Sequence, residues 1–175
     1  MKHRKLHLLV SIVGFLISLD QLTKTMVTAD FRLGESMAVI TNFFSLTLIH
    51  NTGAAFGLLA NLPPEIREPF FLVLPSLTLT AILYAYYKLP DEDVMSIYGL
   101  ILIVGGALGN LIDRVRLGYV VDFLDFHWYG KYHFPAFNVA DSAICIGVGI
   151  LIVNLIITPE PEVDNKPTGS SIVKG

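Results

Sequence analysis

Three runs without a charged residue constrain the fold of this chain more than any other feature of its sequence. They cover residues 69–87, 94–112 and 142–158, and each approaches the ~20 apolar residues with which a helix crosses a bilayer. Only 15% of the chain is charged, 53% is hydrophobic and the mean hydropathy is +0.62. The sequence therefore predicts an integral membrane protein and excludes both a soluble domain and a disordered chain.

The N-terminal segment predicts one more membrane-spanning helix. Three basic residues within the first five precede an apolar stretch over 8–19, as in a signal peptide. However, Asp20-Gln21 follows where small residues would mark a cleavage site, so we expect a retained helix. The chain then has an even number of spans, which places both termini on one side, and the basic cluster places that side in the cytoplasm. The expected spans are 7–27, 69–87, 94–112 and 138–157.

The remaining segments complete a single membrane domain over 1–158. Apolar and polar residues alternate within 36–60, which predicts an extracytoplasmic β-element lying at the membrane surface. Residues 63–68 predict a short interfacial helix that begins with proline and leads into the second span. The segment 159–175 is rich in Pro, Glu, Ser and Gly, and we expect a disordered cytoplasmic tail. The predicted fold class is an all-α membrane protein, a four-helix bundle with a small β-cradle.

Ionisable residues at membrane depth are functional candidates because they are costly to place there. Asp20 and Lys24 are spaced i, i+4 and can pair on one helix face. Asn110, Asp113 and Arg114 are spaced to form one polar face at the outer end of the third span. For both sets, a structural role in packing or anchoring and a direct functional role remain open.

Two isolated carboxylates predict acid–base chemistry. Asp122 is embedded among bulky apolar residues, and Asp141 opens the fourth span. An aspartate there can cap the helix, but Asn138 is better placed to do so, so we expect Asp141 to point into the bundle. Both carboxylates lie on the outer side and come from separate elements, so they could share one site, as a water-activating acid–base pair requires.

The other reactive residue types are less informative. His127 and His133 lie in an aromatic loop and could ligate a metal, but no third ligand has a diagnostic spacing. Interfacial aromatic residues are the ordinary explanation of such a loop. Cys145 is the only cysteine, so no intrachain disulfide can form, and we expect it to be a small buried apolar residue.

Five blocks in order along the chain carry a resemblance to a known family. They are DQLTK at 20–24, NTGAAF at 51–56, GGALGNLIDR at 105–114, VVDF at 120–123 and FNVADS at 137–142. From about residue 7 to 157 the chain resembles bacterial lipoprotein signal peptidase, also called signal peptidase II. The resemblance implies an aspartic endopeptidase of the bacterial inner membrane, with its active site near the outer face.

The resemblance also implies the site and the substrate. Asp122 and Asp141 match the catalytic pair. The implied substrates are prolipoproteins with diacylglycerol on the lipobox cysteine, cut on the amino side of that cysteine without a cofactor or metal. Membrane lipid and cyclic peptide inhibitors of the globomycin type are the other implied partners. Residues implied to bind substrate or support the site are Asp20, Lys24, Asn51, Gly53, Asn110, Asp113, Arg114, Asn138 and Ala140.

Other functional classes are less consistent with the sequence. The net charge is −3 and no basic stripe occurs, so nucleic acid is not an expected partner. A proton-coupled transporter is the main alternative because it also uses intramembrane carboxylates, but these usually lie near mid-membrane. An assembly or chaperone function would explain the β-element but not two isolated carboxylates.

Overall fold

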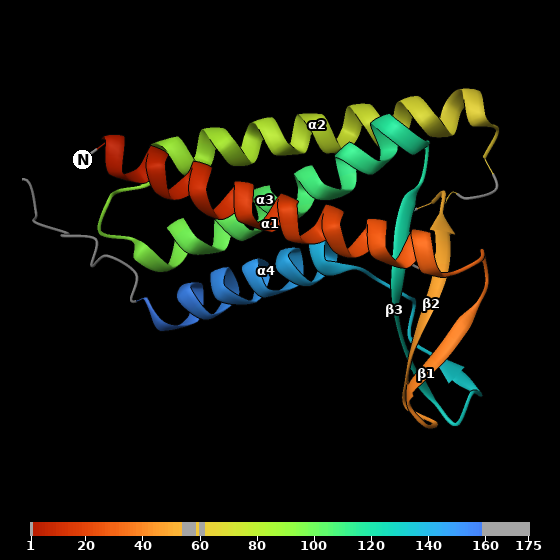
Figure 1. Cartoon of the computed structure of the whole chain (residues 1–175). Coiled ribbons are helices and arrows are strands. Elements are labelled where there is room, and N and C mark those ends of the chain that lie inside the picture. The colour runs from red at the N-terminus through yellow and green to blue at the C-terminus, as the bar shows by residue number, and fades with distance from the viewer. Residues whose placement is uncertain (1, 54–58, 60–61, 159–175) are drawn as a thin grey trace, which may run out of the picture.

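Four long helices form the body of the protein, for which a computed structural model describes residues 2–53, 59 and 62–158. They run side by side along most of their length (Figure 1). By length and composition, each can cross a membrane, so the prediction of four spans is confirmed. The helices are α1 (Lys2–Asp30), α2 (Pro64–Lys88), α3 (Val94–Leu117) and α4 (Val139–Ile157).

The short helix expected over 63–68, leading into the second span, forms the N-terminal end of α2. This helix starts at Pro64 and continues without a break to Lys88. Proline suits the first helical turn because its missing N–H has no partner there in any case. The expected tail over 159–175 lies outside the described residues, as do 54–58 and 60–61 of the expected β-element.

A small antiparallel sheet lies across one end of the helix bundle (Figure 1). The β-element expected over 36–60 supplies its first two strands, whereas the other two come from the segment between α3 and α4, for which the sequence analysis predicts no strand. The strands are joined in the order β1-β2-β3-β4. They are β1 (Ser36–Ile40), β2 (Phe44–Asn51), β3 (Val120–Trp128) and β4 (Tyr132–His133).

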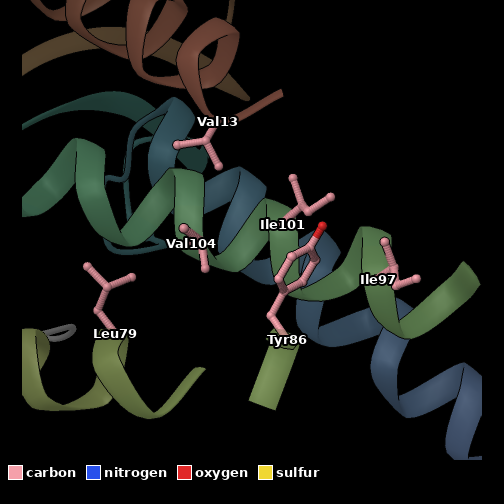
Figure 2. Close-up of a cluster of buried hydrophobic side chains, with 6 residues drawn as sticks. All are labelled: Val13, Leu79, Tyr86, Ile97, Ile101 and Val104. Carbon is pink, nitrogen blue, oxygen red and sulfur yellow. The ribbon is translucent and has the colours of Figure 1, made fainter. Parts of the chain in front are cut away.

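A cluster of buried apolar side chains joins α1, α2 and α3 away from the sheet. Figure 2 shows its six members, and Ile101 at its centre is fully buried. The Tyr86 hydroxyl donates a hydrogen bond to the Lys5 carbonyl oxygen at 2.8 Å, so its polar tip is satisfied. The members are Val13, Leu79, Tyr86, Ile97, Ile101 and Val104.

Glycines bring α3 and α4 into close contact beside the sheet. A Cβ atom on Gly106 would overlap the carbonyl oxygen of Ala140, and one on Gly109 would lie 2.7 Å from a carboxylate oxygen of Asp20. Small residues allow such approach of helix backbones in a membrane, where van der Waals packing drives association. These glycines therefore place the start of α4 against both α1 and α3.

We expect Gly106→Ala to lower the melting temperature of the purified protein by several degrees, because overpacking a tight contact costs ~1–3 kcal/mol. Gly149→Ala is the matched control on α4, since no described atom lies within 4 Å of a Cβ atom added there. Its melting temperature should stay unchanged or rise slightly. Equal losses in the two variants would contradict the close α3–α4 contact.

Candidate active site

Asp122 lies on β3 with only 2% of its surface exposed. Its Oδ1 accepts a hydrogen bond from the Asn138 side-chain amide at 2.7 Å, and its Oδ2 accepts one from the Asn51 amide at 2.9 Å. Both oxygens are therefore held by uncharged donors from other elements, so the carboxyl group has a fixed orientation.

Asp141 lies in the first turn of α4, where Asn138 is the N-cap, as predicted. The two residues form a capping box: the Asp141 N–H donates to Asn138 Oδ1 at 2.9 Å, and the Asn138 N–H donates to Asp141 Oδ2 at 3.2 Å. The Asn110 amide donates to Asp141 Oδ1 at 2.7 Å. Asn138 thus contacts both candidate catalytic carboxylates and places them in one site.

Lys24 is the charged centre behind this site. Its buried ammonium forms ion pairs with Asp20 at 2.8 Å and Asp113 at 2.9 Å, so the predicted i, i+4 pair is present. It also donates to Asn110 Oδ1 at 3.0 Å. Because that oxygen faces Lys24, the NH₂ group of Asn110 faces Asp141.

The two carboxylates that pair with Lys24 also hold the backbone next to each candidate catalytic residue. Asp113 accepts the N–H of Val121 at 3.1 Å, and Asp20 accepts the N–H of Ala140 at 3.0 Å. These are the residues immediately before Asp122 and Asp141. The ion-pair cluster therefore positions both aspartates through the main chain.

Gln21 belongs to this cluster although the sequence interpretation did not select it. Its side-chain amide donates to Asp113 at 2.8 Å, and its carbonyl oxygen accepts a hydrogen bond from Arg116 at 3.2 Å. The available signal was its place in the block DQLTK, directly after Asp20.

Arg114 separates from Asn110 and Asp113 instead of sharing one polar face with them. Its guanidinium donates to the Gly53 carbonyl oxygen at 3.0 Å and stacks over the Phe71 ring at 4.4 Å from the centroid. The Gly53 N–H in turn donates to Asn51 Oδ1 at 3.0 Å. Arg114 thereby fixes the turn that orients Asn51 toward Asp122.

An open cavity of about 340 Å³ lies beside Asn51, between the start of α2 and the end of α3. Because Asn51 also contacts Asp122, the cavity adjoins the site. Its walls combine apolar and charged side chains. They include Asn51, Thr52, Arg67, Glu68, Phe71 and Arg114.

Burial raises the pKa of Asp122 from its ordinary value of 3.8 to about 7. The Asn51 and Asn138 amides act against this shift, while the nearby Asp141 carboxylate adds to it. A carboxyl group with such a pKa can exchange a proton near neutral pH. The arrangement can therefore supply one protonated and one ionised carboxyl group.

The remaining reactive residues have other partners. His127 Nε2 lies 3.0 Å from the Ser45 hydroxyl, and His133 Nδ1 lies 2.9 Å from Asp125. Within the described residues, no three His, Cys, Asp or Glu side chains are grouped to hold a metal ion. Cys145 is exposed on α4 and not buried as expected, because its helix face carries no packing partner from the described chain.

Comparisons with known proteins agree over nearly the whole chain. A family model for signal peptidase II matches residues 12–157. The lipoprotein signal peptidase of Syntrophotalea carbinolica is 47% identical over 87% of this chain and 93% of its own length. That of Desulforapulum autotrophicum is 47% identical over 93% of this chain and 99% of its own length. The chain belongs to the signal peptidase II family. The resemblance seen in the five sequence blocks is thus confirmed.

The fold agrees with this family assignment. A solved bacterial membrane enzyme matches with a TM-score of 0.76 and 33% sequence identity, covering 96% of this chain and 95% of its own. As a signal peptidase II family member with four apolar helices, the protein is a peptidase and a multi-pass bacterial membrane protein.

We expect the melting temperature of Asp122→Asn, measured relative to that of the wild type, to increase as the pH rises from 4 to 8. Folding raises the Asp122 pKa from 3.8 to about 7, so the wild type loses stability as pH rises between those values, and the loss is complete above pH 7. The asparagine variant has no such loss, which amounts to at most ~4 kcal/mol. Melting temperatures of both proteins across this pH range provide the test. A constant difference between them would contradict the raised pKa.

Proposed function

We propose that this protein is an aspartic endopeptidase with Asp122 and Asp141 as its catalytic pair. Its substrates are diacylglyceryl-modified prolipoproteins, and it removes the signal peptide by cutting on the amino side of the lipidated cysteine. Lipoprotein signal peptidase relatives at 47% identity support this substrate class. No metal or cofactor takes part in the proposed reaction.

The observation that carries the proposal is the contact of Asn138 with both carboxylates. It donates to Asp122 through its side chain and forms a capping box with Asp141. A helix cap alone needs only the second contact. The first brings a buried carboxylate from a strand to the same asparagine, which supports two carboxyl groups that act as a pair and share a proton.

In the proposed mechanism, the ionised aspartate takes a proton from a water molecule as the water oxygen attacks the scissile carbonyl carbon. The protonated aspartate hydrogen-bonds the carbonyl oxygen and stabilises the negative charge that develops there. The resulting tetrahedral intermediate collapses as its C–N bond breaks and the amine leaving group receives the proton that the first aspartate took from water. Because the two groups titrate as a unit, either can hold the shared proton in the resting enzyme.

Residues beside the pair are proposed to bind the substrate. Arg114 and Asn51 border the cavity that adjoins Asp122, and amide and guanidinium donors suit an extended peptide backbone. Lys24 and its partners Asp20, Asp113 and Asn110 are proposed to hold the catalytic pair in place. Cyclic peptides of the globomycin type are expected to compete with substrate here.

We place both termini in the cytoplasm and the active site near the outer face of the inner membrane. The dense basic cluster at the start of α1 favours the cytoplasmic side. The sheet and the two aspartates lie at the opposite end of the bundle from the N-terminus (Figure 1). A diacylglyceryl group held in the outer leaflet can therefore reach the site. The main alternative, a proton-coupled transporter, finds no support in the family match.

Asp122→Asn and Asp141→Asn should each lower kcat by roughly 10²–10⁴-fold or more, because an amide keeps the shape of the group but cannot exchange its proton. Cleavage of a lipidated precursor peptide by purified protein in detergent measures this. Asp125→Asn is the matched control, because Asp125 lies three residues away on the same strand and should keep substantial activity. Loss of activity in Asp125→Asn with survival in Asp122→Asn would show that the wrong carboxylate was chosen.

Precursors that carry diacylglycerol should be cleaved with at least ~10-fold higher kcat/KM than the same peptides without it. Burial of each methylene group contributes about 0.8 kcal/mol, so two or three buried groups suffice for this ratio. Paired assays on one enzyme preparation measure it, with a strong chelator added in a parallel series that should leave the rate unchanged. Equal kcat/KM for both substrates would remove lipid recognition from the proposed function.

A further inference from the structure

The Gln21 side chain contacts both carboxylates that pair with Lys24. Its amide nitrogen donates to Asp113 Oδ1 at 2.8 Å and lies 3.3 Å from Asp20 Oδ2 and from the Gly109 carbonyl oxygen. An amide NH₂ group has two hydrogens, so it can serve acceptors on α1 and α3 at once. Gln21 therefore joins these two helices at the level of the ion cluster.

The charges of this cluster do not balance at Lys24. The ammonium carries one positive charge, whereas the Asp20 and Asp113 carboxylates that pair with it carry two negative charges. The three side chains are at most 4% exposed, and a buried charge is costly unless it is paired or hydrogen-bonded. Uncharged donors therefore stabilise the second negative charge. The Gln21 amide is one of them, together with the two main-chain N–H groups that bond to these carboxylates.

Arg116 determines which end of the Gln21 amide faces the carboxylates. Its guanidinium donates to Gln21 Oε1 at 3.2 Å, and a guanidinium has donors only. The oxygen of Gln21 is thus held away from Asp113, and the NH₂ group is held toward it. Hydrogen bonds in a chain polarise one another, so the positive charge of Arg116, exposed in the last turn of α3, strengthens the donor that Gln21 offers to the cluster.

The path from Gln21 to a candidate catalytic residue is short. Gln21 donates to Asp113 Oδ1, and Asp113 Oδ2 accepts the N–H of Val121. Val121 is the residue before Asp122 on β3. Without the Gln21 amide, the Asp113 carboxylate loses the hydrogen bond that fixes its plane, so the main chain next to Asp122 loses a fixed partner.

We propose that Gln21 is a positioning residue for the peptidase reaction and that Arg116 is its anchor. Gln21 offers an uncharged donor to the ion cluster and so holds Asp122 in place through the Asp113 bond to the main chain. This inference rests on the proposed function, because it concerns the placement of Asp122. The alternative roles are helix packing for Gln21 and a favourable charge at the end of α3 for Arg116. Neither requires an effect on turnover by the folded protein.

Gln21→Glu and Gln21→Met separate positioning from packing. Both variants nearly keep the length of the side chain, but the first places a carboxyl group against Asp113 and the second removes every hydrogen bond. An ionised carboxyl group repels Asp113, whereas a protonated one donates to it. We expect kcat of Gln21→Glu, relative to the wild type at the same pH, to be about 30-fold lower near pH 8 and to recover to within about fivefold near pH 5.

Gln21→Met has no group to titrate, so its kcat should be about tenfold lower than that of the wild type at every pH, with KM within about twofold. Single-turnover cleavage of a lipidated precursor peptide by the full chain in detergent measures both variants, and the melting curve gives the folded fraction. Full turnover of Gln21→Met per folded molecule, or a pH-independent ratio for Gln21→Glu, overturns the proposal while the wild type and its Asp122→Asn control behave as expected. A wild type that cleaves no precursor contradicts the proposed function itself, and this inference fails with it.

Thr25→Glu is the matched control for the introduced charge. Thr25 is exposed one helical turn after Gln21 on α1, and its hydroxyl bonds only to the Gln21 main-chain carbonyl oxygen among the described residues. The same carboxyl group at this position lies outside the ion cluster, so it should leave kcat and its pH dependence unchanged. A pH-dependent loss equal to that of Gln21→Glu would show a general effect of charge on α1 and overturn the proposal.

Arg116→Met tests the anchor. Because Arg116 acts through Gln21, the single variant should lose about two- to threefold in kcat, and adding it to Gln21→Met should cause no further loss. Arg116→Lys keeps the charge and a donor, so it should restore most of the activity. Losses that multiply in the double variant, or an unchanged kcat in Arg116→Met, overturn the role of Arg116.

Discussion

The geometry of the site depends on the ion pairs that the Lys24 ammonium forms. It is buried at the end of α1, and a buried charge must be paired to be tolerated. Asp20 and Asp113 supply the pairing charges. The same two carboxylates accept the backbone N–H groups of Ala140 and Val121, so one ion cluster fixes the residue before each candidate catalytic aspartate and joins α1, α3, β3 and α4.

Amide side chains separate the Lys24 ammonium from the two candidate catalytic aspartates, Asp122 and Asp141. Asn110 accepts from Lys24 and donates to Asp141, while Asn138 donates to both Asn110 and Asp122. An ammonium in direct contact favours the ionised form of a carboxyl group strongly. Burial affects the Asp122 pKa more than Lys24 does. The amides thus transmit position from the ion cluster while the pair retains the ability to share a proton.

The sequence predicted the helices well because each membrane span is encoded by one local segment. A charge-free apolar run of sufficient length can satisfy its own backbone hydrogen bonds in a membrane by forming a helix. Strand β3 was missed because its partner β2 lies about 70–80 residues away along the chain, and β4 was missed with it because β4 pairs with β3. Both aspartates and Asn138 could be selected from local motifs. The role of Gln21 and the direction of Arg114 could not, because each depends on a partner from another element, Asp113 and Gly53 respectively.

The odd spacing of the two carboxylates on β3 explains why only one of them can work with Asp141. Side chains alternate between the faces of a strand, so residues three apart point in opposite directions. Asp122 points toward α4, whereas Asp125 accepts from Thr47 and pairs with His133 on the opposite side of the strand. A slip of one residue in the β2–β3 register would exchange the faces. The Asn51 contact with Asp122 and the Asp113 contact with Val121 oppose that slip, so the hydrogen bonds that orient the candidate catalytic residue also determine which aspartate it is.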